Sequence, residues 1–438
     1  MKKVICLLLA VFLLISPMVF ATGSEEMKTT EKGADETVTI TWASWALAEE
    51  SLKPTYMAMV NEFMRQNPNV KVETVAYPYS QYKDQIIISA AGGNAPDVVH
   101  VKEEWIPPLM DLDCLLPLNE YIDPEIRDDY FPSILDGATY DGNIMCAPWF
   151  NSPYALFYNK TLMAKAGITE LPTTLSELFE DARKISALGA DENGNKIYGY
   201  LQCNSKKETG VGYNFFPVMW GFGGEFVDEN GNVVINSPEN IEAFKAIKGI
   251  YCDKISPNGT DFKDARNLFA QGLIGFYYDI EMAKGAIALA SAKGNEFEKE
   301  YSTMVIPSET GPDGYGYLVQ HHNVVMKSAK NQEAAVKLAT FLAGPEVLKI
   351  LFDAGMGKMP ARESVLSLDF FSHPESPLSQ AFINALATAR PLPTGNDKFI
   401  LADEKIADTL TMLASPNTDV EKAVANLDEQ VKELYGQN

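Results

Sequence analysis

The sequence is poor in cysteine, and its cysteines lack the spacing of a metal or redox site. Apart from Cys6 near the N-terminus, they are Cys114, Cys146, Cys203 and Cys252, widely separated and without a Cys-x-x-Cys pair. This spacing predicts neither a metal centre nor another cofactor. One or two disulfides and four buried thiols are both compatible with it.

Basic residues are scarce relative to acidic ones. The 438 residues include 36 Lys and Arg against 59 Asp and Glu, which gives a formal charge of −23. Such an excess of acid argues against nucleic acid or an anionic membrane surface as a partner. The chain also lacks Gly-x-Ser-x-Gly, His-Glu-x-x-His and P-loop motifs, so no enzyme activity is expected.

Long apolar runs are absent beyond the N-terminus. There, Lys2 and Lys3 precede an apolar run over 4–15, and small residues follow up to Ala21. The run is shorter than the roughly 20 residues that a membrane-spanning helix needs. It predicts a secretory signal over 1–21, cleaved near Ala21, with a flexible leader over 22–37. The mature protein is then periplasmic or extracellular; a retained N-terminal anchor is the alternative.

The pattern after residue 38 alternates between strands and helices. Strands are predicted from Val38, over 70–75 and over 96–101, with helices between them. This order indicates an α/β fold with a parallel sheet, in which ligands gather at the carboxyl ends of the strands. At 438 residues the chain exceeds the roughly 250 to 300 residues of a single core, so two lobes are expected.

The stretch 140–168 is predicted to cross between the lobes and to line the cleft. A turn at Asp141-Gly142 leads into extended runs over 144–148 and 154–158, joined by a polar, aromatic kink over 149–153.

Further on, 174–177 has the spacing of a capping box, and 191–194 and 228–231 are turn signals.

Aromatic, amide and acidic residues stand at several predicted strand ends. A sugar presents apolar C–H faces and a rim of hydroxyls, which flat aromatic rings and polar side chains recognise. The pairs Glu103/Glu104 and Asp279/Glu281 also leave a glycoside-active enzyme open. The neighbours His321 and His322 point to opposite faces of a strand, so hydrogen bonding is expected of them rather than a shared metal.

Five segments in order carry a resemblance to a known family: 92–99, 148–167, 220–224, 269–272 and 328–331. With these the chain resembles the bacterial extracellular solute-binding proteins that deliver sugars to ABC importers, the group that includes the maltose-binding protein. The resemblance implies a small-molecule solute, a carbohydrate, as ligand, a membrane permease as partner, and a monomer.

The resemblance also implies a two-lobed periplasmic-binding-protein fold of the class II type. The hinge is crossed three times, near 147–151, 278–279 and 325–327. An N-lobe is expected from 38–148 plus 280–325, and a C-lobe from 149–279 plus 326–438.

Ligand contacts follow from the same resemblance, position by position. The expected residues are Trp45, Glu104, Trp105, Trp149, Asn151, Tyr213, Phe216, Trp220, Asp279 and Glu281, with His321 and His322 where relatives usually have glycine. An aromatic turn common in relatives is replaced here by 280–282, which leaves the ligand's identity open. A non-sugar solute is the alternative: a polyamine would suit the three acids, whereas a polyol phosphate would need a basic cluster.

Overall fold

The computed structural model describes residues 37–205, 211–311, 314–372, 377–394, 396 and 398–437. The predicted signal over 1–21 lies outside these residues, as does the predicted leader except for residue 37. Among the described residues, no helix combines the length and the apolar character that crossing a membrane requires.

The first strands form the predicted parallel sheet. β1 (Val38–Ala43) lies between β2 (Val70–Val75) and β3 (Val98–Lys102) and is parallel to both. The connections are α1 (Lys53–Gln66) and α2 (Tyr79–Ala91), whose apolar stripes are buried. The predicted β-α-β-α-β order is therefore confirmed, and it brings the carboxyl ends of these strands to one edge.

β6 (Ala147–Asn159) is a single buried strand in which the predicted kink is wrong. Its first half pairs with β10 (Tyr317–Val325) and its second half with β8 (Ile274–Ile280), both antiparallel. At the expected kink the strand instead has a register shift: His321 pairs with Phe150 but His322 pairs with Pro148, which leaves Trp149 as an extra residue. Continuous pairing on both sides therefore keeps the aromatic segment extended.

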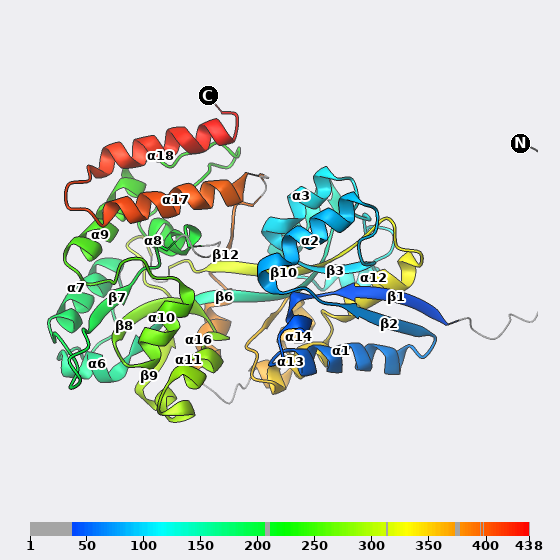
Figure 1. Cartoon of the computed structure of the whole chain (residues 1–438), viewed down its shortest axis with the longest axis horizontal. Helices are drawn as coiled ribbons and strands as arrows, with labels where there is room; N and C mark the ends of the chain where they lie inside the picture. The colour runs from blue at the N-terminus through cyan, green and yellow to red at the C-terminus, as the bar shows by residue number, and fades with distance from the viewer. Residues whose placement is uncertain are drawn as a thin grey trace, which may run out of the picture. The chain divides into compact units, whose positions relative to one another are not determined.

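β6 and β10 join two groups of elements (Figure 1). The strand order is β2-β1-β3-β10-β6-β8-β7.

Around the β1 end lie α3 (Ile106–Asp111), α4 (Pro124–Asp128), α5 (Pro132–Gly137), β4 (Thr139–Tyr140), β5 (Asn143–Ile144), α12 (Gln332–Phe341), α13 (Pro345–Asp353), β11 (Met359–Pro360), α14 (Glu363–Leu366) and α15 (Asp369–Ser372). Around the β8 end lie α6 (Lys160–Lys165), α7 (Leu175–Ser186), β7 (Tyr198–Leu201), α8 (Phe216–Gly221), α9 (Pro238–Cys252), α10 (Phe262–Ala270), α11 (Ala283–Ala290), β9 (Tyr301–Met304), α16 (Pro377–Leu386), β12 (Arg390–Pro391), α17 (Phe399–Leu413) and α18 (Val420–Leu434). Short 3₁₀ helices are η1 (Trp45–Ala48), η2 (Glu103–Trp105), η3 (Tyr213–Phe215) and η4 (Gly294–Glu300).

Each group has its own apolar core. The first core packs β1 and β3 against α1, α12 and α13, and runs from Ile40 to Phe371 along the chain. The second core includes two apolar clusters that meet at β8: Phe276 and Tyr278 belong to one, Ile274 and Tyr277 to the other. Burial on both faces explains why β8 reads as a continuous apolar run rather than an alternating one.

This packing differs from the predicted division in two segments. α11 and β9, expected with the first strands, pack with Tyr277 in the second core. α12 and α13, expected with the second half, supply Leu338 and Leu348 to the first core. The helices that follow β10 thus fold back onto β3 and α1, and the return to the second core comes with α16, where Phe382 packs.

The turn predicted at 141–142 and part of the predicted capping box are formed. The Asp141-Gly142 turn joins β4 to β5, and both residues have positive φ angles, 49° and 77°. At the predicted capping box, Thr174 Oγ1 accepts from the backbone N–H of Glu177, but the Glu177 carboxylate accepts from Thr173 instead of Thr174. Half of the box is therefore formed.

The predicted turns at 191–194 and 228–231 begin identical pentapeptides, Asp-Glu-Asn-Gly-Asn. In the first, Asp191 Oδ1 accepts from the backbone N–H groups of Asn193 and Asn195 at 2.9 and 2.7 Å. In the second, Asp228 Oδ1 accepts from the equivalent Asn230 and Asn232 at 2.9 and 2.8 Å. The carboxylates are occupied by the turns themselves. Among the described residues no cluster suited to a metal ion is found.

Three of the cysteines that the sequence left open, Cys114, Cys146 and Cys252, are free thiols. Cys146 and Cys203 are buried, and Cys114 and Cys252 are half-buried. Burial raises the pKa of the Cys146 thiol, as expected for a thiol that serves packing rather than reaction.

Candidate functional site

An aromatic cluster stands at the carboxyl ends of β1 and β3. Trp45 lies two residues after Ala43, the last residue of β1, and its ring stacks on that of His100 with the ring centroids 3.8 Å apart. Trp105 meets the Trp45 ring edge-on at 5.2 Å, and Tyr79 does so at 5.7 Å. Trp45 and Trp105 are 8% and 7% exposed. Two residues predicted as ligand contacts are therefore brought together.

Lys102 ends β3 beside this cluster. Its Nζ donates to the Tyr79 hydroxyl at 2.8 Å and lies 3.8 Å from Glu104 Oε1. It also lies over the Tyr79 and Trp105 rings, at 5.3 and 5.7 Å from their centroids. Burial alone would lower the pKa of Lys102, but Tyr79 and Glu104 outweigh it and the pKa is raised. Glu104 is thus at the site, with a cation next to it.

A chain of hydrogen bonds runs under Trp45. Ser44 Oγ is 2.9 Å from His100 Nδ1, and His100 Nε2 is 2.9 Å from His321 Nδ1. Burial, and then the neighbouring Lys358, lower the pKa of both imidazoles well below the usual range, so both rings are neutral. A neutral ring carries one N–H, so the tautomer of His100 sets that of His321.

His321 and Phe150 continue the same sheet face onto β6. Their rings are 4.4 Å apart, and Lys358 Nζ lies 4.7 Å from the Phe150 centroid. Lys358 also donates to Ser152 Oγ at 3.3 Å. Asn151 is engaged in the fold: its Nδ2 donates to the Pro360 carbonyl of β11 at 3.1 Å.

Two predicted contacts, Asp279 and Glu281, lie at the end of β8 and just after it. Asp279 on β8 is fully buried and accepts two hydrogen bonds from Arg266 of α10, both 2.8 Å. Glu281 lies 3.4 Å from Lys284 Nζ. Tyr154 on β6 pairs with Ile280, the neighbour of Asp279, and burial and then Asp279 raise its pKa. Asp279 and Glu281 therefore have their own cations, and their contact with a ligand stays a prediction.

Other predicted contacts pack in the cores. Trp149 is fully buried between Trp42 and Tyr56, at ring centroid distances of 5.8 Å from each. His322 is buried, neither ring nitrogen has a hydrogen-bond partner among the described residues, and burial lowers its pKa to about 3. These residues lie behind the aromatic cluster, and their role in ligand binding stays a prediction.

The three predicted contacts within 213–220 lie in η3 and α8. Phe216 and Trp220 belong to the second core, with ring centroids 5.2 Å apart. Arg390 lies over the Trp220 ring at 4.7 Å. Tyr213 lies in η3, and its side chain is outside the described residues.

Four residues of the cluster were missed from the sequence: His100, Lys102, Arg266 and Lys358. His100 lies inside an apolar strand, and Arg266 lies on a helix 13 residues before its partner Asp279. Lys102 does follow a strand end, which is the one signal that would have found it. Three of them, Lys102, Arg266 and Lys358, are cations. With Lys284 they make four cations against the three acids Glu104, Asp279 and Glu281, so the site is not the acidic one that the sequence suggested.

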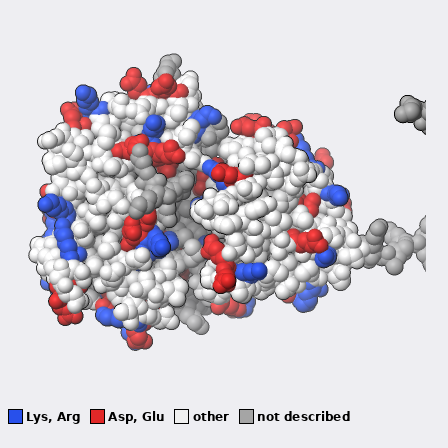
Figure 2. All heavy atoms as spheres, viewed as in Figure 1, with Lys and Arg blue, Asp and Glu red and all other residues white. Residues whose placement is uncertain are grey.

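Three surface cavities lie elsewhere. They have volumes of about 400, 510 and 230 Å³ and are lined by residues within 167–184, within 345–370, and within 284–301 plus Gly355. None is lined by a predicted ligand contact. On the face shown in Figure 2, basic and acidic side chains are interspersed.

The fold and the cluster define a two-lobed α/β binding protein whose lobes share strands β6 and β10. The comparisons make this specific: the chain belongs to the bacterial extracellular solute-binding proteins, whose family model matches residues 49–349. The expected resemblance is therefore confirmed.

Known relatives and structures agree with this assignment. A Brucella abortus protein described as a binding protein is 26% identical over 332 residues, covering 74% of this chain and 77% of that protein. The diacetylchitobiose binding protein of Streptomyces coelicolor is 25% identical, covering 69% and 68%. The GacH receptor of Streptomyces glaucescens, solved unliganded and with acarbose, superposes with a TM-score of 0.77 at 22% identity, covering 91% and 98%.

Proposed function

We propose that this protein binds a sugar or oligosaccharide at the aromatic cluster between its lobes and delivers it to the permease of an ABC importer. The observation that carries the proposal is the placement of Trp45 and Trp105 at the ends of two parallel strands, beside Lys102, Glu104 and His321. Flat rings suit the C–H faces of a pyranose, and the polar groups suit its hydroxyls. The names of the relatives above, a diacetylchitobiose binding protein and an acarbose receptor, point the same way.

The acidic residues argue for binding without chemistry and against a polyamine. Asp279 is held by Arg266, and Glu103 accepts the backbone N–H of Gln320 at 2.5 Å. Burial and then the neighbouring Glu104 raise the pKa of Glu103, and its carboxyl group is engaged with β10. A glycosidase pair needs two free carboxyl groups at the sugar, and a polyamine needs unmatched acids. Neither need is met by these side chains.

Ligand access is proposed to use motion of the lobes. The site side chains are buried together, so a sugar reaches them when the lobes separate, and closure then encloses it. The shared strands β6 and β10 are the proposed hinge, with a third crossing between the first core and α16. The proposed mature protein is a secreted monomer without residues 1–21.

Calorimetric titration of the purified protein against mono- and oligosaccharides tests the proposal, with spermidine and glycerol 3-phosphate in the same panel. We expect a saccharide to bind, and Trp45→Ala to weaken that binding by ~1–3 kcal/mol, as for loss of an aromatic anchor. Leu289→Ala is the control, because that side chain is 90% exposed on α11. Binding of spermidine alone, or equal losses in both variants, would contradict the proposal.

A further inference from the structure

Lys358 is a buried cation for which the structure provides no opposite charge at contact distance. Its side chain lies next to β11 and is 7% exposed. Its hydrogen bond is to the neutral Ser152 hydroxyl, at 3.3 Å, and no carboxylate of the described residues lies within ion-pair distance. Buried lysines are ordinarily paired, because leaving an ammonium without a partner is costly. At a proposed ligand site, the group expected to balance the charge of such a lysine is the ligand itself.

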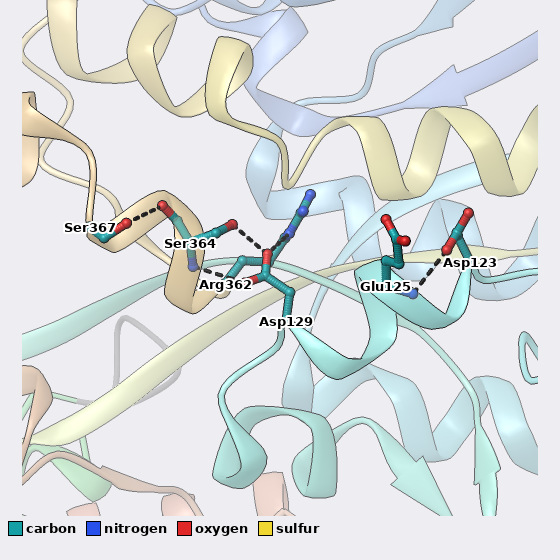
Figure 3. A network of polar contacts seen from close by, with 6 residues as sticks. All are labelled: Asp123, Glu125, Asp129, Arg362, Ser364 and Ser367. Carbon is teal, nitrogen blue, oxygen red and sulfur yellow. Dashed lines mark hydrogen bonds and ion pairs between the residues drawn. The ribbon is translucent and has the colours of Figure 1, made fainter.

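The segment that carries Lys358 is fixed in place. Met359 and Pro360 pair with β6, and Phe131 donates its backbone N–H to the Ala361 carbonyl at 3.1 Å. Asp129 then accepts from Arg362 Nε at 2.7 Å and from Ser364, as Figure 3 shows. Lys358 is therefore positioned by the fold before any ligand arrives, rather than lying on a loop that could place it elsewhere.

The other charged groups around Lys358 are paired with one another: Lys102 with Glu104, Arg266 with Asp279 and Lys284 with Glu281. Burial lowers the pKa of Lys358, and Lys102 and then Arg266 lower it further, to about 8. Glu281 raises this pKa, but its effect is the smallest of the four. Glu281 is close to this segment, since a side chain at Gly357 would overlap its carboxyl group. The nearby His321 and His100 are neutral, and Tyr79 accepts from Lys102. Among the described residues, each of these cations thus has a carboxylate partner, whereas Lys358 has none within ion-pair distance.

A neutral sugar hydroxyl could accept from Lys358 but would leave its charge uncompensated. A carboxylate or phosphate oxygen would supply both the acceptor and the charge, and such charge-assisted bonds are about twice as strong as neutral ones. We infer that the ligand is an acidic saccharide, and that Lys358, with Lys102 across His321, binds its carboxylate or phosphate group. This inference rests on the proposed function and names the chemical class of its ligand.

The test uses matched ligands on the full chain. Galactose, galacturonate and galactose 6-phosphate, and the di- and trisaccharides of galacturonate with their neutral counterparts, are titrated calorimetrically at pH 7. We expect an acidic member to bind at least about tenfold more tightly than its neutral counterpart. The carboxylate and phosphate arms distinguish the two sources of charge.

Variants separate the inference from the proposed function. Lys358→Met should weaken binding of the acidic saccharide about 30-fold or more, as for removal of one partner of a buried charge pair, and the neutral one much less. Lys349→Met, an exposed lysine paired with Asp353 on α13, should change neither. At pH 9, binding of the acidic ligand should take up a proton, which titrations in buffers of different ionisation enthalpy detect, and this uptake should vanish in Lys358→Met.

Each outcome decides the question. If neutral saccharides bind as tightly as acidic ones, or no acidic saccharide binds, the inference is overturned while sugar binding stands. Equal weakening of both ligand types by Lys358→Met also overturns it. If no saccharide of either type binds, both the inference and the proposed function fail.

Discussion

The two sides of the candidate site are built from different chemistry. The β1 and β3 side presents Trp45, Trp105 and a chain of neutral histidines, whereas the β8 side presents Asp279 locked to Arg266. On the first side the histidines hydrogen-bond in series and stay uncharged, with the Lys102–Glu104 pair beside them. On the second side charges neutralise one another within the fold. Under the proposed function, the first side contacts the ligand, while the ion pairs of the second side mainly stabilise the fold.

Breaking the charged side should have the largest effect. Asp279→Asn leaves Arg266 largely buried without its carboxylate, so we expect a loss of ~3–5 kcal/mol in the free energy of unfolding, measured with urea. The double variant Asp279→Leu with Arg266→Met is the control and should recover much of this loss. If the single variant unfolds like the wild type, the pair does not hold this side together.

Trp149 lies behind the aromatic side and should affect stability more than binding. Trp149→Ala removes a fully buried ring from the first core, so we expect a loss of ~3–5 kcal/mol in the free energy of unfolding. Trp45→Ala, at the edge of the same cluster, should lose affinity with a smaller change in stability. A Trp149→Ala protein of normal stability but weak affinity would instead place this ring in contact with ligand.

Acid should weaken the side that carries the histidines. His322 has a folded pKa of about 3 against an ordinary value of about 6.5, so the unfolded chain binds more protons between these values. Its contribution to stability is therefore present above about pH 6.5 and is lost as the pH falls. Compared with wild type, His322→Phe should reduce the slope of unfolding free energy against pH by ~1.4 kcal/mol per pH unit near pH 5. Equal slopes would show that His322 is protonated in the folded state.

The fold was predictable where local pattern decides it. Alternation and helical periodicity are enough to place β1, α1, β2, α2 and β3, and strand ends identify Trp45, Glu104 and Trp105 as neighbours. The lobe boundaries were not predictable, because the side on which α12 and α13 pack depends on apolar partners distant in sequence. The burial of a single helix stripe does not reveal its partner.

The charge of the site could not be read from the sequence. Asp279 and Glu281 suggest an acidic site because they stand next to each other at a strand end, but their cations come from helices α10 and α11. Lys358 reaches the site from a short segment between α13 and β11, with no pattern of its own. Trp149 was misleading for a related reason: the register shift of β6 beside it decides where its ring lies.

The duplicated Asp-Glu-Asn-Gly-Asn turns give the molecule an internal reference. Asp191 and Asp228 make the same hydrogen bonds with bond lengths that agree within 0.1 Å, although the turns flank different elements. Any difference in the amide chemical shifts or hydrogen exchange of Asn193 and Asn230 therefore reports their surroundings alone. A ligand that changes one signal and leaves the other unchanged would show which part of the second lobe senses it, with the reference built into the same spectrum.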